Sequence, residues 1–258
     1  MCDPIRRDAQ TKEADVPNVH DVSLVLGGAG GIGAAVTRRL APIGPVVFTH
    51  HHNPSRARAL VDELAGGEWP CVSVSCDATV AADVEQAFAS ARGLGSVTRL
   101  VFCVGGWSYP KLQDLDPAAI RAEIDLNLVS ALLVLGAGAR RVADGGRIVL
   151  LSSAAAYVAP PRQAVYAAAK AGLEAAARVA GKELARRGVT VNVVRPGATD
   201  TAALRSGTDP RAVDAMSKAN AMRRLGTPDD VAGAVMLLLS LDAGWVTGAV
   251  VDASGGLY

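Results

Sequence analysis

The sequence predicts an α/β protein, a single domain with one doubly wound parallel sheet and helices on both faces. Short apolar runs that contain β-branched residues alternate with longer helical stretches along the chain. A glycine-rich turn also stands directly after the first apolar run and directly before the first helix. Alternation of this kind produces parallel strands that are joined by crossover helices.

Each predicted strand is an apolar stretch of four to six residues. Valine and isoleucine in these stretches favour a pleated and buried conformation. The strands are predicted at residues 22–26, 45–49, 71–75, 100–104, 146–151, 189–194 and 249–252. In a sheet of this type ligands bind at the carboxyl ends of the strands. The turns that follow the strands are therefore expected to converge on one edge.

The stretches between the strands are long enough for helices. Helices are predicted at residues 34–40, 54–64, 80–92, 117–142, 163–187 and 228–241. No repeat or low-complexity linker interrupts the pattern, so residues 20–258 are expected to form one catalytic domain. Residues 1–19 are charged and aperiodic, and we expect them to form a flexible arm.

Composition limits the kinds of partner. The chain has 258 residues, of which 50% are hydrophobic and only 4% aromatic, so its core is expected to be aliphatic. The formal net charge of +1 argues against a nucleic acid or a membrane surface held by bulk charge. The longest apolar stretch, residues 126–139, is shorter than the roughly 20 residues that span a bilayer.

The cysteines and the N-terminal sequence predict a cytoplasmic protein. Cys2, Cys71, Cys76 and Cys103 are scattered without the spacing of zinc ligands, and we interpret them as reduced thiols. The N-terminal sequence is polar and has no apolar segment of the kind found in signal peptides.

The glycine-rich turn occupies residues 27–33. Glycines permit a tight turn and let backbone N–H groups approach a pyrophosphate, whose charge also meets the positive end of the next helix. The spacing fits two patterns. Gly28, Gly30 and Gly33 match G-x-G-x-x-G, whereas Gly27, Gly31 and Gly33 match G-x-x-x-G-x-G.

Tyr166 and Lys170 form a second candidate for chemistry. Residues four apart on a helix share a face, so the two side chains are expected to lie together. An ammonium group beside a phenol stabilises the phenolate, which lowers the pKa of the tyrosine from about 10 toward the range of an acid–base catalyst.

These features resemble the short-chain dehydrogenase/reductase family over about residue 22 to the C-terminus, and within it the 3-oxoacyl-[acyl-carrier-protein] reductases most. The family has a Rossmann-like fold and reduces or oxidises small molecules. The matching motifs are Gly27-x-x-x-Gly31-Ile32-Gly33, Asn127, Ser153, Tyr166-x-x-x-Lys170, Pro196-Gly197, Thr201 and Thr247-Gly248.

The resemblance implies a catalytic set of four residues. Tyr166 would supply the proton to a carbonyl oxygen during hydride transfer, and Lys170 would lower its pKa and hold the nicotinamide ribose. Ser153 would orient the carbonyl oxygen by a hydrogen bond. Asn127 would hold a water that links Lys170 to solvent.

The resemblance also implies a nicotinamide cofactor at the strand ends. The residues expected to bind it are Gly27, Gly30, Gly31, Ile32, Gly33, His50, Asn53, Arg56, Asp77, Ala78, Val104, Gly105, Gly106, Tyr166, Lys170, Pro196, Gly197, Thr199 and Thr201. Asp77 resembles the family residue that contacts the adenine amino group.

The chain departs from the family at two places. Leu26 replaces the usual threonine before the first glycine, and Phe102-Cys103 replaces a pair of asparagines after the fourth strand. We expect altered cofactor affinity rather than lost chemistry, because the four catalytic positions are intact.

The segment after the second strand favours NADPH over NADH. It contains no acid that would bind the ribose 2′-hydroxyl of NADH, whereas His50, Asn53 and Arg56 could receive a 2′-phosphate. Residues 50–52 are three histidines, but neighbours on a strand end point in alternate directions, so we expect no metal there.

The substrate is expected to contact Trp107, Ser153, Ala155, Tyr166 and Met216. Residues 199–222 have the length of a mobile flap over that site. The helices around residues 117–142 and 163–187 have more apolar surface than one sheet can cover, which favours a homotetramer or a homodimer as in the family.

The leading hypothesis is an NADPH-dependent ketoreductase that acts on a β-keto or 3-oxoacyl substrate, free or tethered to a carrier protein or coenzyme A. An NAD-dependent alcohol or steroid dehydrogenase is the second enzymatic hypothesis. A nucleotide-binding scaffold without turnover is the alternative of another class, and Phe102-Cys103 is its best support.

Overall fold

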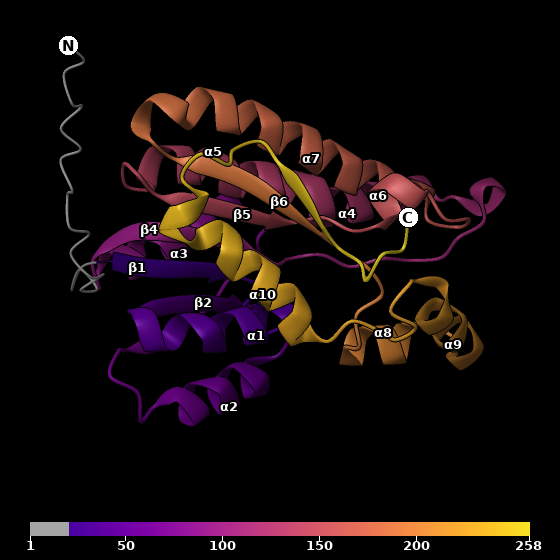
Figure 1. The fold of residues 1–258 in the computed structure, drawn as a ribbon, viewed down its shortest axis with the longest axis horizontal. Coiled ribbons are helices and arrows are strands. Elements are labelled where there is room, and N and C mark those ends of the chain that lie inside the picture. The colour runs from indigo at the N-terminus through magenta and orange to yellow at the C-terminus, as the bar shows by residue number, and fades with distance from the viewer. Residues whose placement is uncertain (1–20) are drawn as a thin grey trace, which may run out of the picture.

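A computed structural model describes residues 21–258 and confirms the predicted doubly wound sheet (Figure 1). The predicted arm, residues 1–19, lies outside the described residues. Seven strands pair in parallel in the order β3-β2-β1-β4-β5-β6-β7. The strands are β1 (Asp21–Leu26), β2 (Val46–His50), β3 (Cys71–Ser75), β4 (Ser96–Phe102), β5 (Arg147–Leu151), β6 (Thr190–Pro196) and β7 (Val250–Ala253).

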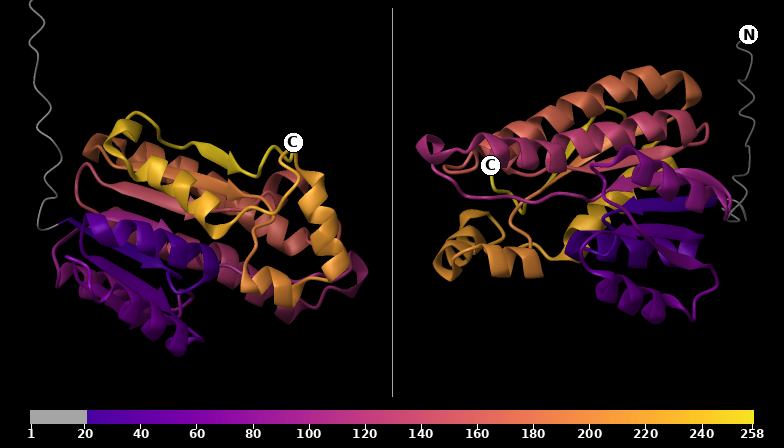
Figure 2. Two further views of the ribbon diagram at one scale, coloured as in Figure 1. Left: turned by 60° about the horizontal axis from the view of Figure 1, so that its bottom comes forward. Right: turned by 180° about the vertical axis from the view of Figure 1, so that it is seen from behind.

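Helices cover both faces of the sheet (Figures 1 and 2). They are α1 (Gly31–Leu40), α2 (Pro54–Leu64), α3 (Ala81–Arg92), α4 (Pro117–Ile124), α5 (Ser130–Arg141), α6 (Ala155–Val158), α7 (Ala164–Leu184), α8 (Ala202–Gly207), α9 (Pro210–Ala219) and α10 (Pro228–Leu239). One face packs on α3, α5 and α7, and the other on α1 and α10.

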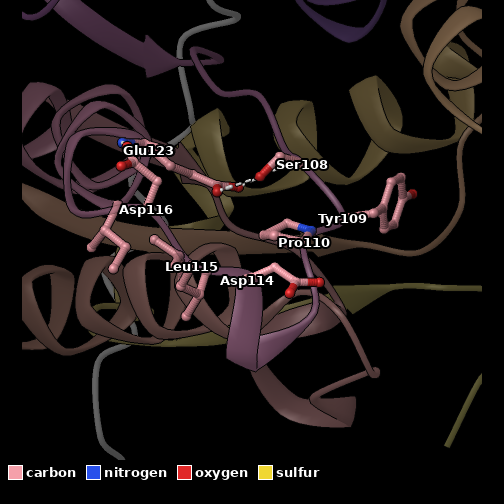
Figure 3. Close-up of a pocket in the computed structure, with 10 residues that line it drawn as sticks. Ser108, Tyr109, Pro110, Asp114, Leu115, Asp116 and Glu123 are labelled. Atoms are coloured by element: carbon pink, nitrogen blue, oxygen red, sulfur yellow. Dashed lines mark hydrogen bonds between the residues drawn. The ribbon is translucent and has the colours of Figure 1, made fainter.

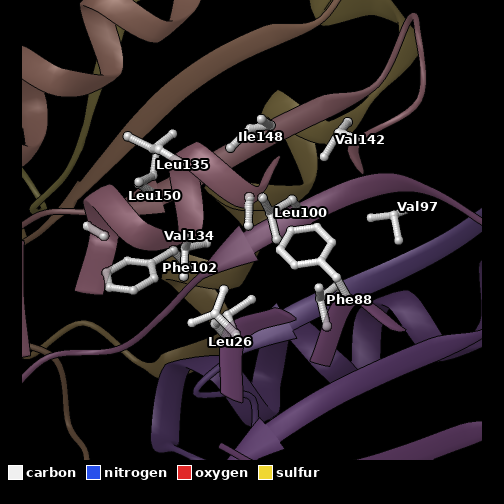
Figure 4. Packing of buried hydrophobic residues seen from close by; sticks show 14 of the residues in the cluster. Leu26, Phe88, Val97, Leu100, Phe102, Val134, Leu135, Val142, Ile148 and Leu150 are labelled. Carbon is white, nitrogen blue, oxygen red and sulfur yellow. The ribbon is translucent and has the colours of Figure 1, made fainter. Parts of the chain in front are cut away.

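The larger core cluster lies between the sheet and the helices α3, α5 and α7 (Figure 4). Its largest side chains, Phe88, Leu100 and Phe102, are completely buried. Burial of one such side chain contributes about 1.5–3 kcal/mol relative to exposure. Phe102 therefore has a packing role, at a position where the family has asparagine.

The strand order changes direction at β1, which pairs with β2 on one side and β4 on the other. In folds of this kind ligands bind at such a switch point, beyond the carboxyl ends of the strands. The segments that follow β1, β4, β5 and β6 meet at that edge, as the sequence predicts.

The long predicted helix at 117–142 is not uniform. A π-helical turn, η3 (Asp125–Val129), separates α4 from α5 and contains Asn127. Such turns within α-helices are frequently found at functional sites. The fourth strand also differs from the prediction: it begins four residues earlier, at Ser96, and ends at Phe102, so that residues 103–106 belong to the loop.

Residues 199–222 contain two helices that the sequence analysis did not predict. Thr201 caps α8 by accepting a hydrogen bond from Leu204 N, and Asp209 caps α9, whose first residue is Pro210. Both helices stand beyond the carboxyl edge of the sheet (Figures 1 and 2). The mobility expected for this segment stays a prediction.

Candidate active site

The glycine turn connects β1 to α1 and is built by close backbone contacts. A Cβ at position 33 would lie 2.2 Å from the Gly27 carbonyl oxygen, and one at position 31 would lie 2.7 Å from the Thr201 side chain. Gly27 has a φ of 75°, a conformation that favours glycine. A Cβ at position 30 would approach only the Gly27 oxygen, at 3.3 Å. A Cβ at position 28 would lie 2.5 Å from Phe48 Cβ. The close contacts thus require glycine at 28 as well as at 27, 31 and 33, and position 30 is the least restricted.

The turn can hold a pyrophosphate. Helix α1 begins at Gly31 rather than at the predicted residue 34, with Gly30 as its N-cap. The first N–H groups of a helix have no partner within the helix, and the helix dipole is positive there. Residues 31–33 thus present N–H donors at the switch point. These residues fit a dinucleotide.

Thr49 supports the turn, and the sequence analysis missed it. Its buried hydroxyl accepts a hydrogen bond of 2.9 Å from Gly27 N. The family places a threonine directly before the first glycine, where this chain has the buried Leu26. The hydroxyl therefore comes from the neighbouring strand β2. Its position as the penultimate residue of a strand beside the turn is the signal that could have revealed it.

Tyr166 lies on α7 beside Ser153, which follows β5. The Tyr166 ring is tilted against Trp107, with 6.3 Å between the ring centroids. The pKa of Tyr166 lies above its usual value of 10, chiefly because of burial, while a hydrogen bond from Ser153 lowers it. This direction is opposite to the predicted one, because desolvation of the phenolate is the largest effect.

Lys170 is one turn further along α7 and is 2% exposed. Its ammonium group lies 5.8 Å from the centre of the Tyr166 ring, so the predicted pair is together. It donates hydrogen bonds to the carbonyl oxygens of Leu151, at 3.2 Å, and Val104, at 3.4 Å. Burial lowers the pKa of Lys170 to about 8.

Asn127 is completely buried in η3 and faces the loop after β4. Its Nδ2 donates to the carbonyl oxygens of Gly106, at 2.8 Å, and Glu123, at 2.9 Å, and its Oδ1 accepts from Gly106 N. A Cβ at Gly105 would lie 2.9 Å from both Asn127 Oδ1 and Lys170 Nζ. The glycine therefore allows both polar side chains to approach the same point.

The residues that were predicted to bind the adenosine end of the cofactor are only partly available for it. The Asn53 side chain caps α2 by accepting from Arg56 N, so its oxygen serves the helix. His51 and His52 do not point apart as expected: their rings stack, with 3.7 Å between centroids. Within residues 21–258 no group of three potential ligands could hold a metal ion.

Asp77 also serves a local turn. Its Oδ1 accepts hydrogen bonds from the backbone N–H and the hydroxyl of Thr79. His51 Nε2 lies 3.8 Å from its other oxygen. The hydrogen bonds with Thr79 are the main reason that the pKa of Asp77 is lowered.

Two cavities flank the candidate site rather than fill it. The first measures about 260 Å³ and is lined by residues of α4 and the loop before it, including Ser108, Tyr109 and Glu123 (Figure 3). The second, of about 500 Å³, lies along residues 159–164. Neither is lined by Ser153, Tyr166 or Lys170.

The structure brings only some of the residues expected to contact the substrate close to Tyr166. Trp107 contacts Tyr166, and Ala155 is buried in the turn after Ser153. Met216 is half-buried on α9. The Tyr109 hydroxyl lies 3.2 Å from the Thr208 hydroxyl, which links the loop after β4 to the segment of α8 and α9.

Fold, glycine turn and Ser–Tyr–Lys arrangement together define a nucleotide-dependent oxidoreductase. A family model described as enoyl-(acyl carrier protein) reductase matches residues 27–258. The chain belongs to the short-chain dehydrogenase/reductase family. Within the described residues no helix is long and apolar enough to cross a membrane.

Relatives of several kinds match almost the full chain. It is 34% identical to acetoacetyl-CoA reductase of Allochromatium vinosum, over 92% of this chain and 98% of the relative. It is 33% identical to the 3-oxoacyl-[acyl-carrier-protein] reductase MabA of Mycobacterium tuberculosis, over 96% of each chain. A blue fluorescent protein from a metagenomic library, solved in complex with NADPH, is 31% identical with a TM-score of 0.86, over 92% of this chain and 97% of that one.

Proposed function

We propose that this protein is an NADP(H)-dependent ketoreductase that interconverts a β-keto or 3-oxoacyl-type carbonyl and its secondary alcohol. The observation that carries the proposal is the meeting of Ser153, Tyr166 and Lys170 at the edge that also holds the glycine turn. The reductase names of two relatives support this choice of reaction.

Tyr166 acts as the proton donor in the reductive direction. Because burial raises the pKa of the phenol, it is protonated at neutral pH and can donate to the carbonyl oxygen. The bound cofactor supplies the hydride. Ser153 donates a hydrogen bond to the same oxygen and so stabilises the negative charge that develops there.

Lys170 and Asn127 assist proton transfer by Tyr166. The Lys170 ammonium favours the phenolate that remains after proton transfer and holds the nicotinamide ribose. Its pKa of about 8 lets it exchange a proton near neutral pH. Asn127 fixes the Gly105–Gly106 loop. A water between Asn127 and Lys170 would return a proton to Tyr166.

The preference for NADPH rests on the segment after β2. His50 ends the strand and two histidines follow, so no carboxylate stands where NADH-specific enzymes bind the ribose 2′-hydroxyl. The Arg56 side chain is exposed on α2, and no carboxylate within residues 21–258 forms an ion pair with it. It can pair with a 2′-phosphate. A relative solved with NADPH also supports this preference.

Two measurements test the proposal. Fluorescence titrations with NADPH and NADH measure both affinities, and we expect tighter binding of NADPH and a loss of that preference in Arg56→Ala. Reduction of acetoacetyl-CoA and related β-keto thioesters is then compared between wild type and Tyr166→Phe. We expect a loss of kcat of about 100-fold or more, because a positioned proton donor contributes about 10²–10⁴-fold. Undiminished turnover in Tyr166→Phe would refute the mechanism.

A further inference from the structure

A buried charged cluster lies directly behind the Ser153–Tyr166 pair. Glu174 is on α7, one turn after Lys170, and is 5% exposed. Its carboxylate accepts a hydrogen bond of 2.7 Å from Ser152 Oγ. It also accepts two from Arg195, from Nε at 2.9 Å and from Nη2 at 2.8 Å.

A gain in folding stability alone does not explain such a cluster. Burying a charge is costly, and a buried ion pair is often no more stable than well-packed apolar residues. A bidentate arginine–carboxylate pair does fix geometry, because two parallel hydrogen bonds define the orientation of both planes. Such a cluster therefore fixes the relative positions of the elements that it joins.

The three residues come from three elements that carry the candidate site. Ser152 follows β5 and precedes Ser153, Glu174 belongs to the helix of Tyr166 and Lys170, and Arg195 is on β6 beside Pro196. The Ser152 hydroxyl also lies 3.4 Å from the Lys170 carbonyl oxygen. The cluster therefore connects the ends of two strands to the catalytic helix.

Ser153 has few contacts of its own that fix it. Besides its hydrogen bond to Tyr166, its hydroxyl accepts one hydrogen bond of 3.2 Å, from Ala155 N. Its backbone neighbours are anchored instead: Ser152 N donates to Val194 O at 2.9 Å, and Ala154 N donates to Pro196 O at 2.8 Å. The position of Ser153 therefore depends on Ser152 and on the end of β6.

We propose that Ser152, Glu174 and Arg195 are positioning residues that hold the Ser153 hydroxyl against Tyr166. This inference rests on the proposed roles of Ser153 and Tyr166. Ser152 acts through Ser153, Glu174 fixes the Ser152 side chain on α7, and Arg195 fixes the Glu174 carboxylate.

Arg195 also has contacts other than those with Glu174. Its Nη1 donates to Asp252 at 3.0 Å and lies near the Tyr258 hydroxyl, and its guanidinium stands 5.3 Å from the centre of the Tyr157 ring. The Arg195 pKa is raised, mainly by the hydrogen bond to Glu174, so the group stays charged. The positioning cluster thus extends to β7.

The first test is a double-mutant cycle with Ser152→Ala, Ser153→Ala and the combined variant. We expect Ser152→Ala to lower kcat roughly tenfold with little change in the KM of the cofactor, because small misplacements of a catalytic group are costly. In the Ser153→Ala background the same change should lower kcat no further. Residues that act through one another show such non-additivity. Glu174→Gln and Arg195→Lys are expected to behave like Ser152→Ala.

Matched controls separate positioning from a general loss of stability. Ser23 is equally buried, in the middle of the inner strand β1, and its hydroxyl has no hydrogen-bond partner, so Ser23→Ala should leave kcat unchanged. Glu85 also pairs with two arginines, far from the site, and Glu85→Gln should likewise leave kcat unchanged. The Tm of each variant is measured alongside.

A readout that needs no turnover is the pKa of Tyr166, followed by NMR of a ¹³Cζ-labelled tyrosine and assigned with Tyr166→Phe. Since the Ser153 hydrogen bond lowers this pKa, Ser152→Ala and Ser153→Ala should both raise it, and the double variant should raise it no further than Ser153→Ala alone. An unchanged Tyr166 pKa in Ser152→Ala, or an equal loss of kcat in both backgrounds, overturns the inference. If the pKa pattern holds but the wild type reduces no carbonyl, the proposed function fails and the positioning cluster stands.

Discussion

The burial of Lys170 predicts that the protein gains stability as the pH rises from about 8 to 10.5. The pKa of Lys170 is about 8 in the folded protein and 10.5 as the ordinary value. Between these values the unfolded chain binds more protons than the folded one, so the free energy of unfolding increases with pH. One pKa unit corresponds to about 1.4 kcal/mol, so the full gain is about 3 kcal/mol.

The assay is urea unfolding of wild type and Lys170→Met at several pH values from 7 to 10. Comparison with the variant is necessary because the thiols of Cys71 and Cys76, with pKa values raised to about 11, work in the opposite direction above pH 9 in both proteins. Both proteins also carry Cys103→Ala, because the charges of Cys103 and Lys170 interact and this effect would otherwise differ between them. At pH 7 the wild type carries the whole penalty of a buried charge. Lys170→Met removes it but leaves the carbonyls of Leu151 and Val104 without this donor.

The expected result is a stability difference between the two proteins that changes by roughly 2–3 kcal/mol in favour of wild type between pH 7 and pH 10. The offset at pH 7 depends on the lost hydrogen bonds, but the change with pH does not. Parallel curves for the two proteins would refute the reasoning, because Lys170 would then titrate at the same pH in both states.

Three further substitutions test the fold around the site. Gly33→Ala should lower cofactor affinity at least tenfold in a fluorescence titration, because its Cβ would meet the Gly27 backbone, whereas Gly66→Ala, with no neighbour within 4 Å, should not. Phe102→Ala should lower the free energy of unfolding in urea by about 3–5 kcal/mol, and a loss below 1 kcal/mol would contradict its place in the core. Thr227→Ala breaks the capping box of α10 and should cost about 1 kcal/mol, which Thr227→Ser should restore.

Periodicity and turn residues were sufficient for most of the fold. The order of strands and helices, the parallel sheet and the glycine turn follow from local patterns that the structure confirms. The π turn at Asn127 has no such signal, because residues 117–142 show one continuous helical pattern. Helices α8 and α9 did have signals: Thr201 and the pair Asp209-Pro210 are typical helix starts.

The candidate site was predictable in its parts but not in its electrostatics. The sequence places Tyr166 and Lys170 on one helix face, yet it does not state how deeply they are buried, and burial determines the direction of both pKa shifts. Support from other strands also escapes a linear pattern. Thr49 binds Gly27 across 22 positions, and Arg195 binds Glu174 across 21.

The ammonium of Lys170 donates hydrogen bonds to the main-chain carbonyls of Leu151, at the end of β5, and Val104, in the loop after β4. Every residue type has a main-chain carbonyl, so these two hydrogen bonds of Lys170 remain when the surrounding side chains are replaced. The loop after β4 can therefore accumulate substitutions, as Cys103 illustrates, without releasing the lysine. For protein engineering, positions 103 and 104 offer a place to vary the polarity of this loop while Lys170 keeps its anchor.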